Sequence, residues 1–485
     1  MTANGFSATA IKPVQSVDTP LPGARAALVL LLVINLFNYL DRYVLASVIP
    51  KIREQLFAKA HEAAAGAEPS FAVRFVDWLG DTFGLTGENA LIGSLAMAFI
   101  VAYMIAAPVF GWLADRTSRW LLVGVGVILW SLASGASGLA VTFGMLFFTR
   151  CFVGIGEAAY GPVAPTMISD LYPVKIRGSV LAWFYMAIPV GSALGYVYGG
   201  QIADLGVEGW RWAFYLVVPP GLVLGLWCFL MREPPRGQSD LLPVQSQIQS
   251  SPAKPGTAGQ GPGTVVAPAR QARFKDYATL LKTPSYLLDT LGMAAMTFSV
   301  GGIAFWMPDY IYAKVKGTLS LGMVNTIFGG ITVVAGLGAT LLGGIAGDRL
   351  RPRFPGSYFL VSALGMFIAF PLILVFPNLS FPLAWVVVFV AVFCLFFNTG
   401  PTNTILANVT HPSIRATGFA FNILIIHALG DAVSPLVMGA IADAHDMGFA
   451  FQAVSGVILL GGLLWLWGSR YLARDTELAP MRLSG

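Results

Sequence analysis

Charged side chains inside apolar segments are the residues of this sequence best suited to chemistry. Asp41 and Arg42 stand side by side in NLFNYLDRYVLASVIP, and Arg150 and Glu157 lie seven positions apart in RCFVGIGE. A charged side chain at the centre of a membrane span costs about 2.5–3.5 kcal/mol on insertion scales, so such residues usually serve a function. A carboxylate takes up or releases a proton when its burial or its distance from a cation changes. These four residues therefore predict proton coupling, and the arginines are also candidates to bind an anionic headgroup.

The spacing of the four residues limits how they face. Neighbours on a helix point about 100° apart, so one of Asp41 and Arg42 can line a cavity while the other reaches a neighbouring helix. Arg150 and Glu157 are two turns apart and share one face. The alternative is a purely structural role, in which both pairs pin helices together and contribute little to stability. We predict that Asp41 takes up the proton and Arg42 tunes it, and that Glu157 is a second carrier with Arg150 as its partner or as a headgroup anchor.

A second set of candidates lies in the C-terminal half. His427 and Asp431 are four apart and share a helix face. Histidine changes its charge near physiological pH, so this pair is a headgroup contact or a pH-sensitive pair, or else a satisfied interior histidine. Further candidate substrate contacts are Asn398, Thr399, Phe305 and Trp306. The alternatives are that the polar pair satisfies carbonyls freed by Pro401, and that the aromatic pair anchors the chain at the membrane interface.

The composition shows which elements must position these residues. The chain has 485 residues, of which 56% are hydrophobic and 11% charged, and its mean hydropathy is +0.72. Soluble domains carry about 25% charged residues. Apolar stretches of about 20 residues, enough to cross a bilayer, recur along the whole chain. A membrane β-barrel would show short alternating segments instead. The sequence therefore predicts an all-α integral membrane protein.

Twelve apolar spans divide into two sets of six. The first set covers 25–50, 89–112, 120–140, 142–171, 178–204 and 211–231, and the second covers 284–313, 318–346, 355–376, 381–409, 414–443 and 448–473. We expect an N-terminal tail (1–24), a six-helix bundle (25–231), a linker (232–283), a second six-helix bundle (284–473) and a C-terminal tail (474–485). The linker is rich in Pro, Gly, Ser and Gln, a composition typical of flexible segments.

The distribution of Lys and Arg predicts the orientation. If both termini and the linker share one side of the membrane, that side holds most of the 29 basic residues. Cytoplasmic loops carry such an excess, so we expect cytoplasmic termini. The short tails favour a multi-pass protein of the cell inner membrane.

The two sets of spans repeat one another. GWLADRTSR and GGIAGDRLRPR place Asp115 and Asp348 233 positions apart, and GGQIAD and MGAIAD place Asp204 and Asp443 239 apart. YPVKIRGSVLAWF matches HPSIRATGFAFN at a similar offset. Matches at nearly one offset indicate duplicated halves with pseudo-symmetric folds.

These motifs resemble the major facilitator superfamily over the whole chain. The signature G-x-x-x-D-R-x-x-R appears as Gly111, Asp115, Arg116 and Arg119, and a copy that departs in its tail has Gly344, Asp348 and Arg349. The resemblance implies two bundles that rock around a central site. It also implies that these loop charges gate the cycle by latching the halves in one state, with a carboxylate facing a helix N-terminus. The gating candidates are Asp115, Arg116, Arg119, Asp348 and Arg349.

A narrower resemblance is to the spinster family, in NYLDRYVLA, GIAFWMPDYI and HALGDAVSP. That family is similar to exporters of lysolipids, with proton coupling proposed. The resemblance implies a proton-coupled secondary active transporter of an amphiphilic lipid, a lysophospholipid or lysosphingolipid, working by alternating access. It also implies that the face of span four carrying Arg150 and Glu157 meets span one at the cavity.

The sequence also allows or excludes several other functions. A facilitator-type carrier of another organic anion or of a drug-like compound would have the same composition. A channel or a non-transporting sensor is a further alternative. An enzyme would need a motif such as H-E-x-x-H or G-x-S-x-G, and ATP-driven transport would need a Walker A motif; the sequence has none of these. We therefore expect no enzyme activity, no cofactor, no metal and no nucleic acid. The expected partners are protons, a small amphiphilic substrate and the bilayer, and the expected state is a monomer.

Overall fold

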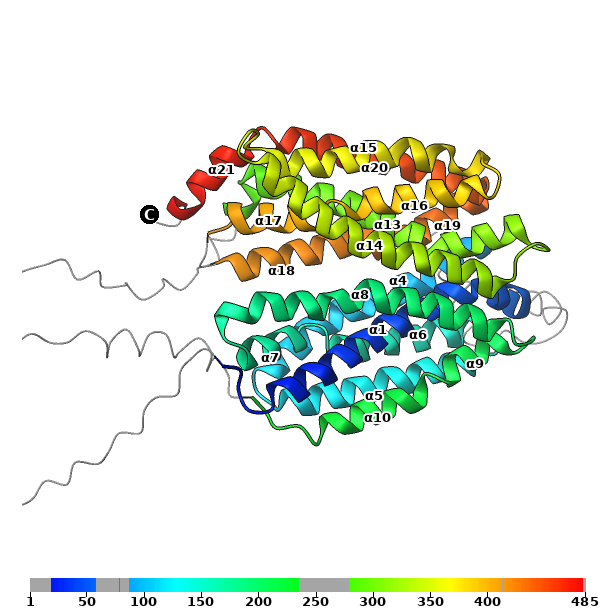
Figure 1. Ribbon diagram of the computed structural model, residues 1–485. Coiled ribbons are helices and arrows are strands. Elements are labelled where there is room, and N and C mark those ends of the chain that lie inside the picture. The colour runs from blue at the N-terminus through cyan, green and yellow to red at the C-terminus, as the bar shows by residue number, and fades with distance from the viewer. Residues whose placement is uncertain (1–18, 58–77, 79–86, 235–278, 412–413, 483–485) are drawn as a thin grey trace, which may run out of the picture.

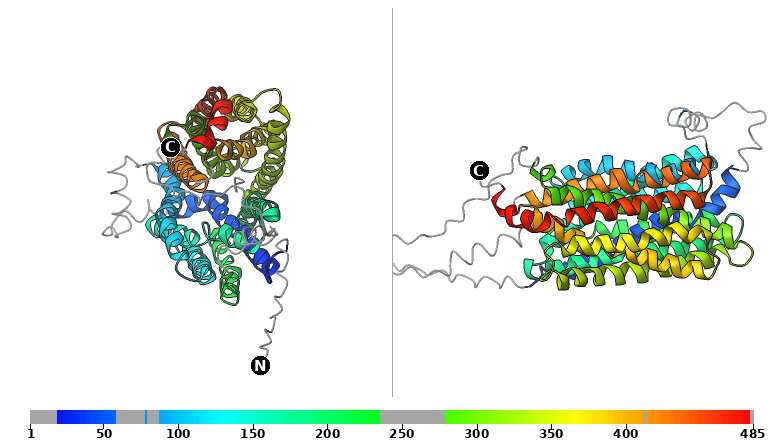
Figure 2. Two further views of the ribbon diagram at one scale, coloured as in Figure 1. Left: turned by 90° about the vertical axis from the view of Figure 1, so that its left-hand side faces the viewer. Right: turned by 90° about the horizontal axis from the view of Figure 1, so that it is seen from above.

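The helices of the chain form two bundles that lie side by side (Figure 1). The computed structural model describes residues 19–57, 78, 87–234, 279–411 and 414–482. Most of the expected linker lies outside these residues. The end-on view in Figure 2 separates the first bundle, blue to green, from the second, olive to red. We call these bundles the N half and the C half.

Each half contains six spans. The N half is built from α1 (Ala24–Ile52), α4 (Glu88–Ala114), α5 (Arg119–Gly138), α6 (Phe143–Ala158), α7 (Ala164–Leu171), α8 (Val174–Ala203), α9 (Gly209–Tyr215) and α10 (Val218–Cys228). The C half is built from α13 (Pro284–Val315), α14 (Leu321–Leu350), α15 (Ser357–Val375), α16 (Leu383–Phe396), α17 (Thr399–Val409), α18 (Arg415–Ile426), α19 (Ser434–Ala444), α20 (Met447–Gly468) and α21 (Leu472–Leu478). Within the described residues, eleven helices are long and apolar enough to cross a membrane. The remaining expected span is divided between α6 and α7.

Four of the expected spans are broken rather than continuous. Pro162 lies between α6 and α7, Pro219 at the start of α10, and Pro401 at the start of α17. In the eleventh span, a π-turn at His427–Asp431 contains a non-helical residue, Gly430. Proline lacks an N–H and clashes with the preceding turn, so it cannot continue a regular helix. Such breaks are tolerated at membrane depth where protein surrounds them.

The last helix, α21, lies at one end of the molecule. We call the end at which α1 begins and α21 lies the tail end, and the opposite end, where α1 finishes, the far end (Figure 1). At the tail end, Asp475 of α21 accepts a hydrogen bond of 2.9 Å from Ser285 N in the first turn of α13. Arg482 binds Asp475 at 2.8 Å and the Val409 carbonyl at 2.8 Å. The last helix therefore fixes the ends of two others.

The halves touch backbone to backbone at the far end. Gly93 of α4 lies against the Pro435 carbonyl of α19, and Gly439 of α19 lies against the Asn89 carbonyl of α4; a Cβ at either glycine would overlap that oxygen. The guanidinium of Arg53 adds an ion pair of 3.1 Å to Asp309 in the other half. The far end is thus closed.

Glycines of α8 let α1 approach closely and determine the rotation of α1. Gly191, Gly195 and Gly199 of PVGSALGYVYGG face α1, and a Cβ at the first two would collide with the carbonyls of Leu36 and Leu40. Helix backbones can approach this closely only where small residues line the contact. This contact fixes the rotation of α1 just before its charged dipeptide.

Candidate functional site

Asp41 points from α1 into the interior of the N half. Its side chain is fully buried, and its Oδ1 accepts a hydrogen bond from Ser134 Oγ of α5. Its Oδ2 has no hydrogen-bond partner within the described part of the chain. A buried carboxylate whose direct partner is a neutral hydroxyl keeps that hydrogen bond when it gains a proton.

Arg42 points toward α6. Its Nη2 donates to Oε2 of Glu157 at 2.7 Å, and the arginine side chain is 24% exposed whereas the glutamate side chain is fully buried. The guanidinium lies 4.8 Å from the ring centroids of both Tyr39 and Phe99. Asp41 and Arg42 therefore face different helices, and only Arg42 is accessible.

Arg150 occupies the interior of the same region. It is almost completely buried, and its guanidinium lies 5.4 Å from the ring centroid of Phe99. Its guanidinium lies near the carboxylates of Asp41 and Glu157. The direct partner of Glu157 is Arg42 rather than Arg150, because the rotation of α1 brings Arg42 to that carboxylate, and a headgroup-anchor role for Arg150 stays a prediction. We call Asp41, Arg42, Arg150 and Glu157 the charge cluster.

Three neighbours of the charge cluster were not predicted from the sequence. Ser134 and Phe99 lie on α5 and α4, and no spacing rule connects them to α1. Tyr39 precedes Arg42 by three positions on α1, so helical spacing was a signal for it. Together these residues give the cluster a hydroxyl donor and two aromatic faces.

His427 and Asp431 form a hydrogen-bonded pair in the C half. His427 Nδ1 and Asp431 Oδ1 are 2.8 Å apart, and the side chains are 30% and 22% exposed. Asp431 packs against Gly301 of α13. The π-turn that carries the pair contacts α4, so the pair lies beside the N half.

The aromatic candidates are buried in the C half. Phe305 and Trp306 are buried, and Trp306 Nε1 donates to the Pro435 carbonyl at 2.8 Å. Helix α19 covers the α13 face that carries Trp306, and substrate contact by these two residues stays a prediction.

The polar candidates beside Pro401 serve the helix break. Asn398 is fully buried and donates to the Leu395 carbonyl at 2.6 Å, and Thr399 Oγ1 donates to the Phe396 carbonyl at 2.9 Å. Both side chains thus bond carbonyls near the break, and their role as substrate contacts stays a prediction.

The gating candidates make the bonds described here within their own half. Arg119 pairs with Asp170 and Glu233, and Asp348 accepts 2.7 Å from Tyr358. Arg116 donates to the Trp112 carbonyl and lies over that ring. Asp115 lines a pocket of about 270 Å³ at the tail end with Arg119, and Arg349 is exposed. These bonds are not a latch between the halves.

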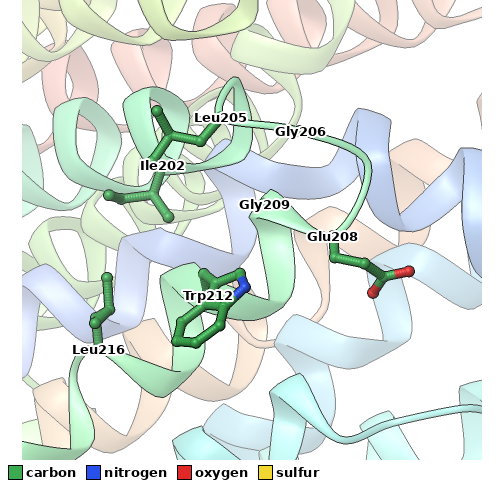
Figure 3. Close-up of a pocket in the computed structure, with 7 residues that line it drawn as sticks. All are labelled: Ile202, Leu205, Gly206, Glu208, Gly209, Trp212 and Leu216. Carbon is green, nitrogen blue, oxygen red and sulfur yellow. The ribbon is translucent and has the colours of Figure 1, made fainter.

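A larger pocket lies elsewhere. It has a volume of about 400 Å³ and is lined at the far end by Ile202, Leu205, Gly206, Glu208, Gly209, Trp212 and Leu216 (Figure 3). It contains no residue of the charge cluster. Among the residues that the structure describes, no group of three or more His, Cys, Asp or Glu side chains is placed to hold a metal ion.

The sequence matches known families along most of its length. A profile of the Major Facilitator Superfamily matches residues 31–435. The chain is 33% identical to spinster homolog 3 of Danio rerio, over 95% of this chain and 87% of that protein. It is 31% identical to spinster homolog 1 of Homo sapiens, over 96% and 84%.

Solved structures share the fold. A bacterial homolog of the human lysosomal transporter spinster, in an inward-facing and occupied conformation, has a TM-score of 0.72 and 21% identity, over 94% of this chain and 99% of that one. A D-xylose–proton symporter has a TM-score of 0.63 and 18% identity, over 91% and 96%. The predicted all-α fold with two six-helix bundles is confirmed.

Proposed function

Because this chain belongs to the major facilitator superfamily and, within it, to the spinster family, we propose that it is a proton-coupled secondary active transporter of a lysophospholipid or lysosphingolipid, working by alternating access. Family membership establishes a multi-pass membrane transporter rather than an enzyme. The observation that carries the finer proposal is the charge cluster: two carboxylates and two guanidiniums, of which only one guanidinium is accessible.

The proton step follows from the partners of the two carboxylates. A proton on Glu157 would break the ion pair with Arg42 and leave a partly buried cation uncompensated, which is costly. A proton on Asp41 leaves the hydrogen bond from Ser134 in place. Asp41 is therefore the first site to load.

The substrate step follows from the accessibility of Arg42. A guanidinium is well suited to bind a phosphate in a forked geometry, and a headgroup phosphate that reaches Arg42 competes with Glu157 for it. His427 and Asp431 lie on the π-turn of the C half that contacts α4, the helix of Phe99, and they are the second set of headgroup contacts. Thr399, His427 and Asp431 are the candidates of the C half that stay partly exposed.

The last part of the proposal is the orientation of the protein in the membrane. The excess of basic residues favours the cytoplasm for the tail end, so both termini and the linker are cytoplasmic. Since the far end is closed, Arg42 is reached from the cytoplasmic side in this state. The membrane is the cell inner membrane, the transporter works as a monomer, and the tail-end charges Asp115, Arg116, Arg119, Asp348 and Arg349 gate the opposite state.

The test is uptake of a fluorescent lysophospholipid into proteoliposomes with an imposed pH gradient. We expect gradient-driven uptake by the wild type and its loss in Asp41→Asn, which keeps the shape and removes the charge. The matched control is Asp289→Asn, the same change at a fully buried aspartate of α13 outside the cluster. No gradient-driven uptake by the wild type would refute lysolipid–proton coupling, and an excess of an organic anion or drug-like compound tests that alternative. Equal loss in both variants would refute the role of the cluster.

A further inference from the structure

Asp443 of α19 crosses from the C half to the first turn of α4 in the N half. Its Oδ1 accepts from Asn89 N at 3.0 Å and from Asn89 Nδ2 at 2.8 Å, and its Oδ2 accepts from Ala90 N at 2.7 Å. Helix α4 has Gly87 at its N-cap, with no capping side chain of its own. A carboxylate of one half therefore supplies the cap of a helix in the other.

Asp204 makes the corresponding contact in the opposite direction. It ends α8 in the N half, and its Oδ2 accepts from Gly322 N, in the first turn of α14 in the C half, at 2.7 Å. Ser320 already caps this helix by accepting from Met323 N, so Asp204 satisfies a further donor. The first backbone N–H groups of a helix have no partner within it, and they carry the positive end of the helix dipole.

Each of the two carboxylates lies against a glycine. A Cβ at Gly87 would overlap the carboxylate of Asp443, and a Cβ at Gly322 would lie 2.9 Å from Oδ2 of Asp204. Each acceptor is an aspartate of the repeated motif, and Gly322 follows Asn89 by the same 233 positions that separate the two signature motifs. The pairing is thus built twice, once in each direction between the halves.

We propose that Asp204 and Asp443 are gating residues of the transport cycle: two carboxylate latches that hold the far end closed and must break when it opens. When the halves part, α4 loses its capping side chain and α14 loses one of two, and the freed N–H groups must be solvated instead. The ion pair of Arg53 with Asp309 reinforces the same closure. The proposal rests on the transporter function of the family and is independent of lipid specificity and proton coupling.

The experiment is a distance measurement by electron spin resonance between spin labels at Val141 and Leu383. These residues are exposed, and they lie at the far end, between α5 and α6 of the N half and at the start of α16 of the C half. The labels are placed on a full-length chain in nanodiscs, with Cys151, Cys228 and Cys394 replaced by alanine. The variants are Asp204→Ala, Asp443→Ala and the double substitution.

We expect each single variant to raise the ratio of long to short far-end distances about fivefold, the size of a typical capping effect. The double variant should raise it by about the product of the two, because separate contacts acting on one equilibrium add in free energy. An unchanged distribution in the double variant would overturn the proposal.

The matched control is Asp446→Ala. Asp446 lies three positions from Asp443 and caps α20 within its own half, accepting from Phe449 N at 3.0 Å, so its loss should leave the distances unchanged. An equal shift in this control would overturn the proposal. Gly87→Ala is a second route: it keeps both carboxylates but displaces Asp443, and it should shift the distances in the same direction if an alanine latch variant does not fold.

Discussion

The replacement of Glu157 by Gln tests whether substrate and carboxylate compete for Arg42. The substitution keeps the shape of the side chain and removes the charge that faces the guanidinium at 2.7 Å. A hydrogen bond to a charged group contributes about 1.5–3 kcal/mol. Because Arg42 is 24% exposed, we take the lower end of that range. An anionic headgroup should therefore bind about tenfold more tightly to the variant, since 1.4 kcal/mol corresponds to a factor of ten.

The assay is equilibrium binding of a fluorescent lysophospholipid to the protein in nanodiscs. A monoacylglycerol of the same chain length is the ligand control, because it carries no charge and should bind both proteins equally. Glu208→Gln is the protein control, since Glu208 forms an ion pair with Arg211 at the far end and outside the charge cluster. The guanidinium stays between the rings of Tyr39 and Phe99, which keeps it in place when its partner is lost.

Two results would contradict this reasoning. If the lysophospholipid binds wild type and variant with equal affinity, Arg42 does not receive the headgroup. If the monoacylglycerol gains as much affinity as the lysophospholipid, the variant has loosened the cavity rather than freed a cation.

Three further changes test the packing around the site. Gly195→Leu should cost at least about 3 kcal/mol in the free energy of unfolding and lower uptake, because its side chain collides with the Leu40 carbonyl and displaces α1 beside the charged dipeptide; chemical denaturation measures this. Trp306→Phe should cost about 1 kcal/mol by removing the hydrogen bond from Nε1 to the Pro435 carbonyl, with the KM of uptake unchanged. Asp475→Ala should cost about 1 kcal/mol, because α13 loses a bond at its N-terminus, and thermal unfolding should show it.

Matched controls accompany these three changes. Gly330→Leu places the same side chain on α14 where a Cβ meets no atom within 4 Å, and it should be tolerated. Trp183→Phe alters a tryptophan whose side chain is exposed and should leave stability unchanged. Glu477→Ala removes a carboxylate of the same helix that caps nothing described here. A raised KM in Trp306→Phe would return that residue to the substrate site.

The helices were predictable because one physical requirement determines them. Crossing hydrocarbon needs about 20 apolar residues, and each expected span contains helix at its predicted place. The breaks were less predictable. Pro162 and Pro401 disturb the helix locally, but whether a span bends or stops depends on what surrounds it, which the sequence alone does not show.

The residues of the charge cluster could be predicted from the sequence, but which of them form an ion pair could not. Two arginines were available to Glu157, and the helical spacing favoured the one on its own helix. The choice of Arg42 follows from the rotation of α1, which the glycines of α8 set through a contact between helices about 150 positions apart. The burial of Trp306 depends in the same way on the distant carbonyl of Pro435. Such contacts follow from tertiary packing and leave no local signal.

The reciprocal far-end contacts have the geometry of a two-fold symmetric dimer interface. In such an interface, residue i of one subunit contacts residue j of the other, and j contacts i in return. Here the end of α8 meets the start of α14, and the end of α19 meets the start of α4. If a single six-helix unit had paired with its own copy, one aspartate would have made both contacts. In one chain the two contacts can differ, and they do: α4 has an extra donor in the side chain of Asn89, where α14 has Gly322.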